Sequence, residues 1–320
     1  MNSLRDKYLT LLCKGEIELI ESDAQRVYGD FSWCRFGIRD PSVLARPDGK
    51  PVIDSNGHIR LYFNGRDRDI PDGGVTQVGL FTGSQNDGWN MFPDPVFMDG
   101  SYAAQGSVLE ISRDCYRMYY SPDTKVGFSL ATSCDGIKWE RFSNDLILQT
   151  SQFNLNRMGL PYVQFIGGRW IMVFEGIDNG KFHLYIAFSE DGIDWVPGNA
   201  SQPIYIADES AWDSAGQANP SLVASENDGT FYIFYNGCSY PGEWEIGILV
   251  SRAVGGEWSS SNKPLLKRGK AGSWNQGRIE GARFIEYEKK SFGIVYFGLP
   301  SENSYAKGQI SFVNLSTLKI

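Results

Sequence analysis

The chain has 320 residues, a formal net charge of −8 and a pI near 5.0. The acidic balance argues against general nucleic-acid binding, which needs a basic surface, and no apolar stretch approaches the roughly 20 residues of a membrane-spanning helix. Hydrophobic residues make up 42%, enough for a substantial core, while 14% aromatic residues and 36 glycines favour short strands and tight turns. We therefore expect a soluble protein with neither nucleic acid nor membrane as a partner.

The N-terminal residues 2–13 are the one segment with a helical pattern. Their apolar patch, Tyr8 to Cys13, lacks the long hydrophobic region and the small-residue cleavage site of a signal peptide. We expect a cytoplasmic protein, with export of a processed form as the open alternative. Nothing in the sequence indicates an oligomeric state.

The cysteines and histidines predict no metal site. Five cysteines at scattered positions, with no CxxC motif, fit reduced thiols better than a disulfide framework. Only His58 and His183 are available as imidazole ligands, so a zinc site is not expected. No cofactor is predicted, although a Ca²⁺ in a channel lined by Asp, Asn and Gln is conceivable.

A turn motif recurs along the chain. Three copies combine Ser, Asp-Gly and Trp, a fourth is weaker, and Asp-Gly favours a tight hairpin turn before the strand that the Trp begins. We interpret all of them as structural hairpins. The copies are SQNDGWN (84–90), SCDGIKW (133–139), SEDGIDW (189–195) and SRAVGGEW (251–258).

A pair of strands precedes each of these four turns, and a fifth pair follows in the last part of the chain. The first strand of each pair is short and apolar, and the second ends in aromatic residues. Aligned by their apolar residues, the units repeat at intervals of roughly 55 to 65 residues. The first strands are DPSVL (40–44), QGSVLEI (105–111), LPYVQFI (160–166), NPSLVA (219–224) and EGARFIE (280–286).

Five units of about four strands predict an all-β protein: a five-bladed β-propeller of four-stranded antiparallel blades. The last unit lacks its outermost strand, and EIELIES (16–22) is expected to supply it and close the ring. No linker divides the chain, so one domain over 1–320 is expected. The predicted blades are 31–100, 101–155, 156–210, 211–270, and 271–320 with 16–22.

The heads of the five inner strands form one column, where ligands of a propeller bind. We align Asp40, Gln105, Leu160, Asn219 and Glu280 there, ahead of a column of Pro or Gly. Pro and Gly suit a position where strand pairing ends. The ends of the second strands form another layer, in which we align Asn64, Ser121, Glu175, Asn236 and Gly298.

Three carboxylates are the candidate catalytic residues. Asp40 and Glu280 belong to the first and last blades, which are neighbours in a closed ring, and paired carboxylates can supply the acid and the base of glycoside hydrolysis. Glu175 stands in the apolar run VFEG, where desolvation raises the pKa of a carboxyl toward that of a general acid. The competing interpretation is that each acid is an ion-pair partner of a nearby arginine.

Cationic, amide and aromatic side chains also gather at the expected channel mouth. An arginine-rich rim on an acidic protein favours an anionic ligand, and aromatic side chains can stack on sugar rings. Each residue alone also has a structural interpretation. The predicted substrate-binding residues are Arg39, Arg66, Gln105, Asn219, Arg283, Asn64 and Trp212.

These motifs resemble the five-bladed propeller glycosidases, the relatives of glycoside hydrolase families 43, 32, 62, 68 and 130. The resemblance rests on IRDP (38–41), on YFNG-like strand ends and on the S-x-D-G-x-x-W turns, and it covers about residues 31–315. It implies a base or nucleophile at Asp40. The second Asp usual in that group has no counterpart, because Leu160 and Asn219 fill the third and fourth slots.

Three functions that use a small ligand remain open, beside a protein–protein scaffold, which the narrow mouth of five blades favours less. The first is a glycosidase-like enzyme that acts on a saccharide, an anionic one among the candidates, with Asp40 as base or nucleophile and Glu280 or Glu175 as acid. The second is a saccharide-binding propeller without catalysis, which the missing acids favour. The third is a transferase or lyase acting on an acidic or activated sugar.

Overall fold

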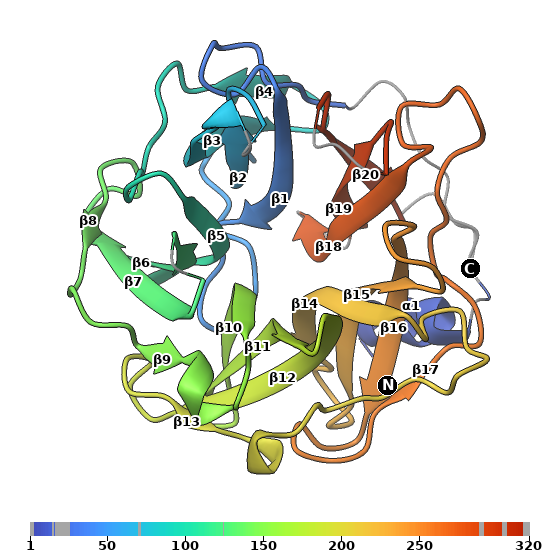
Figure 1. Ribbon diagram of the computed structural model, residues 1–320. Coiled ribbons are helices and arrows are strands. Elements are labelled where there is room, and N and C mark those ends of the chain that lie inside the picture. The colour runs from blue at the N-terminus through green and yellow to red at the C-terminus, as the bar shows by residue number, and fades with distance from the viewer. Residues whose placement is uncertain are drawn as a thin grey trace.

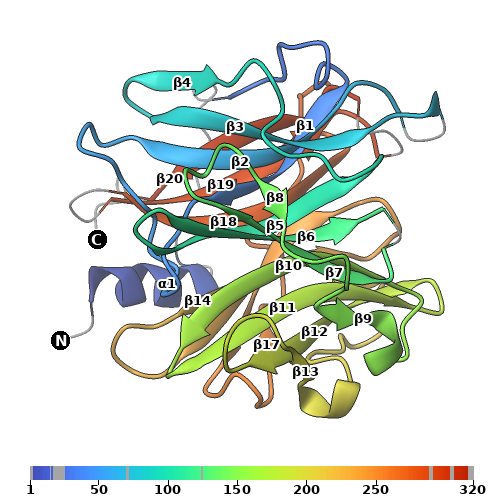
Figure 2. The same ribbon diagram turned by 90° about the vertical axis from the view of Figure 1, so that its left-hand side faces the viewer.

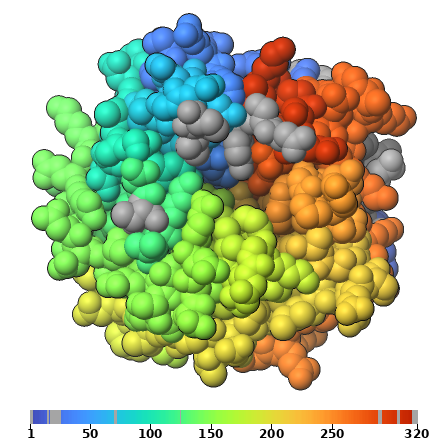
Figure 3. Space-filling view, in the orientation of Figure 1, coloured from blue at the N-terminus to red at the C-terminus, as the bar shows by residue number. Residues whose placement is uncertain are grey.

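The computed structural model describes residues 3–14, 16, 26–69, 72–123, 125–287, 291–302 and 306–315. It confirms an all-β, five-bladed propeller, with the five sheets arranged around a central axis (Figure 1). The inner strands of the blades are neighbours in ring order, and the inner strand of the fifth blade contacts that of the first. Space-filling atoms show the blades in successive sectors (Figure 3).

The strands of each blade pair in chain order. Blade one has β1 (Gly37–Val43), β2 (Ile59–Arg66), β3 (Thr76–Ser84) and β4 (Gly88–Met91). Blade two has β5 (Ala103–Ser112), β6 (Cys115–Pro122), β7 (Gly127–Ser133) and β8 (Glu140–Arg141), and β9 (Leu148–Gln149) also pairs with β7. Blade three has β10 (Arg157–Ile166), β11 (Arg169–Asp178), β12 (Lys181–Ser189) and β13 (Val196–Pro197).

The last two blades complete the ring. Blade four has β14 (Gly216–Ala224), β15 (Phe231–Cys238), β16 (Glu245–Ser251) and β17 (Ser259–Ser260), and blade five has β18 (Arg278–Tyr287), β19 (Ser291–Leu299) and β20 (Gln309–Asn314). Two single 3₁₀ turns, η3 (Thr150–Gln152) and η4 (Asn199–Ser201), lie in blades two and three.

The expected closing strand, 16–22, lies outside the described residues except for Glu16. Blade five therefore shows three strands in the described part of the chain. A short antiparallel bridge joins Val27 to Ile310 of β20, so a segment N-terminal to blade one does pair with blade five.

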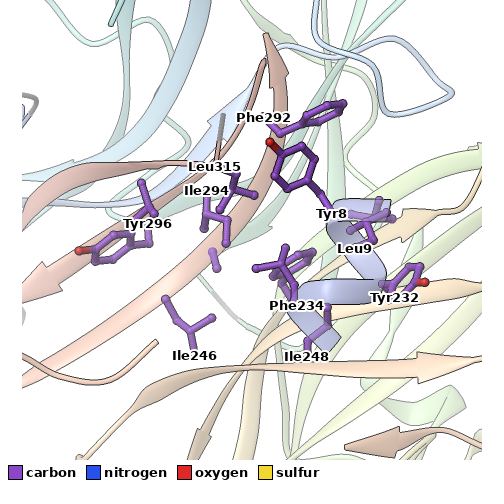
Figure 4. Close-up of a cluster of buried hydrophobic side chains, with 14 of the residues drawn as sticks. Tyr8, Leu9, Tyr232, Phe234, Ile246, Ile248, Phe292, Ile294, Tyr296 and Leu315 are labelled. Atoms are coloured by element: carbon purple, nitrogen blue, oxygen red, sulfur yellow. The ribbon is translucent and has the colours of Figure 1, made fainter. Parts of the chain in front are cut away.

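Hydrophobic clusters fill the spaces between neighbouring blades. Each of the five large clusters draws side chains from two adjacent sheets, so burial of apolar surface holds the ring together. Between blades four and five, Phe234 and Ile248 meet Ile294, and Tyr8 and Leu9 are added from outside the ring (Figure 4).

Tyr8 and Leu9 belong to helix α1 (Leu4–Lys14), which confirms the helix expected over 2–13. It lies outside the ring of strands (Figure 2). Asp6 accepts hydrogen bonds from the backbone N–H of Glu226 at 3.0 Å and from the side chain of Asn227 at 2.7 Å, which attach the helix to the β14–β15 loop. No helix in the described ranges is long and apolar enough to span a bilayer.

The Asp-Gly turns join the third and outer strands of blades one to three, as predicted for hairpins, and they also connect blades. The Tyr62 hydroxyl of blade one donates to the Gly136 carbonyl in the turn of blade two at 2.6 Å. Tyr119 of blade two donates in the same way to Gly192 of blade three at 2.9 Å. The two turns are thus acceptors for the preceding blade.

Each inner strand carries a bulge near its beginning. In four blades the bulge contains a residue with positive φ: Asp40 (50°), Leu160 (51°), Asn219 (48°) and Gly281 (70°). Asp, Asn and Gly adopt this conformation at low cost, whereas Leu160 is strained by about 1–2 kcal/mol. The Asp-Pro pair of IRDP is therefore a bulge, with a Pro where φ is negative.

Candidate active site

A pocket of about 520 Å³ opens at the end of the channel where the bulges lie. All five blades contribute to its lining. Its charged side chains comprise five cations and three carboxyls: Arg39, Arg66, Lys125, Arg157, Arg278, Asp40, Glu175 and Glu280. The three predicted catalytic residues thus line one pocket, although they come from blades one, three and five.

Asp40 is held by neighbouring blades as well as by its own. Its Oδ2 accepts a hydrogen bond from Asn64 Nδ2 at 2.9 Å, and its Oδ1 accepts one from Asn219 Nδ2 at 3.1 Å. Arg39 Nε lies 3.3 Å from Oδ2. The residue is only 4% exposed, so the carboxylate is fixed in orientation while one surface reaches the pocket.

A hydrogen bond repeats between blades at this end of the ring. The residue near the end of the second strand accepts from the backbone N–H of the bulge in the next blade. This bond supplies a partner for the backbone N–H that the bulge takes out of strand pairing. The acceptors and donors are Asn64 with Gln105 (3.0 Å), Ser121 with Leu160 (3.2 Å), Glu175 with Asn219 (2.9 Å) and Asn236 with Gly281 (3.0 Å).

The alignment of blade five is corrected by one residue. Glu280 pairs with Phe297, as Arg39 pairs with Asn64, and the bulge residue with positive φ is Gly281. Gly281 is therefore the counterpart of Asp40, and Phe297, not Gly298, is the counterpart of Asn64. The apolar pattern alone does not reveal where a bulge inserts its extra residue.

Glu175 combines the repeated bond with an unusual environment. Its Oε2 accepts from the Asn219 N–H, and no described residue donates to Oε1. Burial, opposed by that hydrogen bond and reinforced by the negative charges of Asp40 and Glu280, raises the pKa of Glu175 to about 7. The carboxyl is therefore a mixture of protonated and ionised forms near neutral pH.

Glu280 lies beside an arginine on its own strand. Arg278 Nε is 3.1 Å from Glu280 Oε1, and both side chains are largely buried. Burial raises the pKa of Glu280; the Arg278 charge opposes this effect and the Asp40 charge adds to it. The predicted proximity of Asp40 and Glu280 is seen in this electrostatic interaction, and so is the competing ion pair with arginine.

The predicted binding residues divide into three groups. Arg39 and Arg66 line the pocket. Gln105, Asn219 and Asn64 are almost fully buried and bind Asp40 or its backbone, so they support the site from behind.

Arg283 and Trp212 do not line this pocket. Arg283 lies deeper in the channel, and its guanidinium donates a hydrogen bond of 3.0 Å to Asn219 Oδ1. Trp212 packs on Tyr235 in the core between blades three and four, and its indole N–H donates to the Ser261 carbonyl at 3.0 Å. The ring of Trp212 is used in packing outside this pocket, so the structure gives no support to the direct substrate contact expected of it.

The pocket also contains residues that the sequence did not single out. Lys125 lies on the blade-two side, and Phe182 and Trp244 form an edge-to-face pair, with ring centroids 5.6 Å apart, on the side of blades three and four. All three stand in or beside loops on the second-strand to third-strand connection. That shared position is a signal that a propeller prediction could have used.

Within the described ranges, no group of three or more His, Cys, Asp or Glu side chains is arranged to hold a metal ion. All five cysteines are free. Cys238 lines the pocket but is 2% exposed, and burial raises its thiol pKa to about 12, so it is not a nucleophile at neutral pH.

No known protein-family profile matches the sequence. An uncharacterized protein of Mycobacterium tuberculosis, Rv1502, is 24% identical over 209 residues. The alignment covers 59% of this chain and 66% of that protein, so the chain spans just under two thirds of the length of this relative.

Solved glycoside hydrolases have the same fold. A glycosyl hydrolase from Bacteroides ovatus superposes with a TM-score of 0.66 at 13% identity, covering 94% of this chain and 91% of that one. A thermostable family-43 glycoside hydrolase gives 0.62 at 16% identity, covering 87% and 89%. The α-L-arabinofuranosidase PaAbf62A of Podospora anserina, in complex with cellotriose, gives 0.64 at 12% identity, covering 92% and 94%. At these identities the likeness shows the five-bladed propeller fold.

Proposed function

We propose that the protein is a glycosidase-like enzyme that cleaves a saccharide in this pocket. The observation that carries the proposal is the meeting of Asp40, Glu175 and Glu280 from three blades in one cavity, with the pKa of Glu175 raised to about 7. Glycoside hydrolysis needs one carboxylic acid and one carboxylate at neutral pH. The fold shared with solved glycoside hydrolases supports the same assignment.

Asp40 and Glu175 take different roles because their surroundings differ. Asp40 accepts two amide hydrogen bonds and lies beside Arg39, so its carboxylate is held in one orientation at the pocket. It is the proposed base or nucleophile. Glu175 is the proposed general acid, because its raised pKa keeps a proton available near pH 7. Glu280, paired with Arg278, is the alternative acid.

The aromatic side of the pocket suits a sugar. Phe182 and Trp244 add apolar rings from blades three and four to the same lining as the carboxyls and the cations. A sugar has an apolar face of C–H groups and an edge of hydroxyls, so it can contact both sides at once. In a sugar complex, carboxyls about 5 Å apart would indicate retention of anomeric configuration and about 6.5–9.5 Å inversion.

Turnover by Asp40→Asn tests this proposal on a panel of 4-nitrophenyl glycosides and oligosaccharides. We expect loss of roughly 10²–10⁴-fold in kcat/KM, with the circular dichroism of the wild type retained. Asn64→Ser, which changes a partner of Asp40 but leaves all three carboxyls, is the matched control and should lose less. Equal turnover by Asp40→Asn and the wild type would exclude the proposed role of Asp40.

A second candidate is a saccharide-binding propeller without catalysis. The specific observation in its favour is that Glu175 fills a position where Asn64, Ser121 and Asn236 make the same inter-blade bond without any charge. If Glu175 serves only that bond, saccharides should bind in the pocket and no product should form between pH 4 and 9.

A further inference from the structure

One wall of the pocket is more cationic than its carboxyls require. Of the five cations, Arg39 lies beside Asp40, and Arg278 beside Glu280. Arg66 lies 3.9 Å from Asp69. Lys125 and Arg157 have no carboxylate within 4.0 Å among the described residues, although the Arg157 charge acts on Glu175 in the same pocket and lowers its pKa. Both face the same cavity, on a protein whose overall charge is −8.

Backbone contacts place Lys125 and Arg157 together. The N–H of Met158, the residue after Arg157 on β10, donates to the carbonyl of Lys125 at 3.0 Å. The N–H of Lys125 donates to the Pro122 carbonyl at 3.1 Å, and Lys125 has a φ of 54°. A lysine in this conformation is strained by about 1–2 kcal/mol, so the loop holds Lys125 at this place at a cost.

The charges around Lys125 confirm that the cations form one group. Burial, together with the positive charges of Arg157, Arg39 and Arg66, lowers the pKa of Lys125 to about 8, and the charge of Asp123 opposes this effect. The Lys125 ammonium lies 4.2 Å from the centroid of the Tyr102 ring. The cation–π contact orients the lysine but supplies no negative charge.

Like charges gathered in a concave site repel one another, and a bound anion removes that repulsion. Guanidinium groups match the planar or tetrahedral oxyanions of carboxylates, sulfates and phosphates. Phe182 and Trp244 add apolar rings to the lining from blades three and four. An acid group would therefore be oriented toward blades one to three, with the rest of the ligand toward blades three and four.

We propose that Lys125 and Arg157, beside Arg39 and Arg66, form an oxyanion subsite of the pocket, which selects a saccharide that carries an acid group. That the ligand is a saccharide rests on the proposed function. That it carries an oxyanion rests on the residues that line the pocket. The oxyanion is a carboxylate or an ester of phosphate or sulfate on the sugar, and a free ion bound in its place is the alternative that the second test separates.

The first test is calorimetric titration with sodium sulfate at pH 7.0 in a low-chloride buffer. We expect sulfate to bind the wild type and to bind about tenfold more weakly for each charge removed in Lys125→Gln and Arg157→Gln. Arg113→Gln is the matched control, because it removes one positive charge at a side chain that is 95% exposed and outside the pocket. Equal sulfate binding by the wild type and the double variant would overturn the subsite.

The second test identifies the source of the oxyanion with matched ligand pairs: glucuronate against glucose, galacturonate against galactose, and glucose 6-phosphate against free phosphate. Tighter binding of an acidic sugar than of its neutral partner, lost in the double variant, supports an acid group on the saccharide. Binding of free phosphate alone assigns the subsite to a free ion and overturns the selection of acidic saccharides.

These readouts do not depend on turnover. Sulfate binding without cleavage of any glycoside would sustain the subsite and refute the proposed enzyme. Cleavage of a neutral glycoside that is unchanged in the double variant, without sulfate binding, would refute the subsite and sustain the enzyme.

Discussion

The junctions after blades three and four use the same hydrogen bond with different chemistry. In one, Glu175 accepts from the Asn219 N–H at 2.9 Å; in the other, Asn236 accepts from the Gly281 N–H at 3.0 Å. An amide is a sufficient acceptor, and it adds a donor that reaches the Ile279 carbonyl at 2.9 Å. A carboxylate at the same position has no N–H to donate, and its burial costs free energy. Joining the two blades therefore does not require a carboxyl at this position.

The comparison suggests that Glu175 has two functions, one structural and one chemical. Its Oε2 serves the junction and its Oε1 remains available to the pocket. Substitutions that keep the acceptor but remove the acid should separate the two functions. Asn236 carries no acid, so its substitution should affect stability alone.

The largest effect is expected from Glu175→Gln. Glutamine keeps a carbonyl oxygen for the Asn219 N–H but cannot deliver a proton, so cleavage of unactivated glycosides should fall roughly 10²–10⁴-fold. The midpoint of thermal unfolding should stay near that of the wild type. Activity of the wild type should decline as pH rises through about 7, because the acid form is lost, and this limb should be absent from the residual activity of the variant.

If Glu175→Gln kept the activity of the wild type, Glu175 would not be the general acid. Either Glu280 would then be the acid or the proposed mechanism would have none. A large drop in unfolding temperature would instead show that the carboxyl matters mainly to the junction.

An intermediate effect is expected from Asn236→Ala. The change leaves the Gly281 N–H and the Ile279 carbonyl without partners in a buried place, which should lower the free energy of unfolding by about 1–3 kcal/mol for each group left unpaired. Urea titration measures this. Saccharide cleavage per folded molecule should be unchanged, and a loss as large as that of Glu175→Gln would contradict the distinction between the two junctions.

The smallest effect is expected at the Asp-Gly turns. Tyr62→Phe removes the bond to the Gly136 carbonyl while the ring still packs against Trp139. A loss of about 0.5–1.5 kcal/mol in unfolding free energy is expected. Tyr119→Phe, which makes the same change one blade later, should match it. Unequal losses would show that the two turns are not equivalent.

The fold could be predicted from the sequence because its signals are local and repeated. Asp-Gly turns and strands ending in aromatic residues recur at a nearly constant spacing, and each copy supports the others. Asp40, which the alignment puts at the head of the first inner strand, lines the pocket, and its catalytic role stays a prediction.

Other parts of the site could not be predicted because they depend on bulges and loops. A bulge shifts the register by one residue, so Glu280 was aligned where Gly281 lies. Lys125 stands in an irregular loop with no periodic pattern, and a backbone bond with Met158 brings it beside Arg157. Trp212 was expected to bind sugar because sequence does not show which aromatic residues are used in packing.

The most direct test of the account is the titration of Glu175 by NMR, with ¹³C-labelled glutamate carboxyls and Glu175→Gln to assign the signal. We predict an apparent pKa near 7 in the wild type, which falls in Asp40→Asn because a neighbouring negative charge is removed. A pKa near 4.5 in both proteins would contradict the account, because Glu175 would then be an ordinary ionised acceptor at a blade junction.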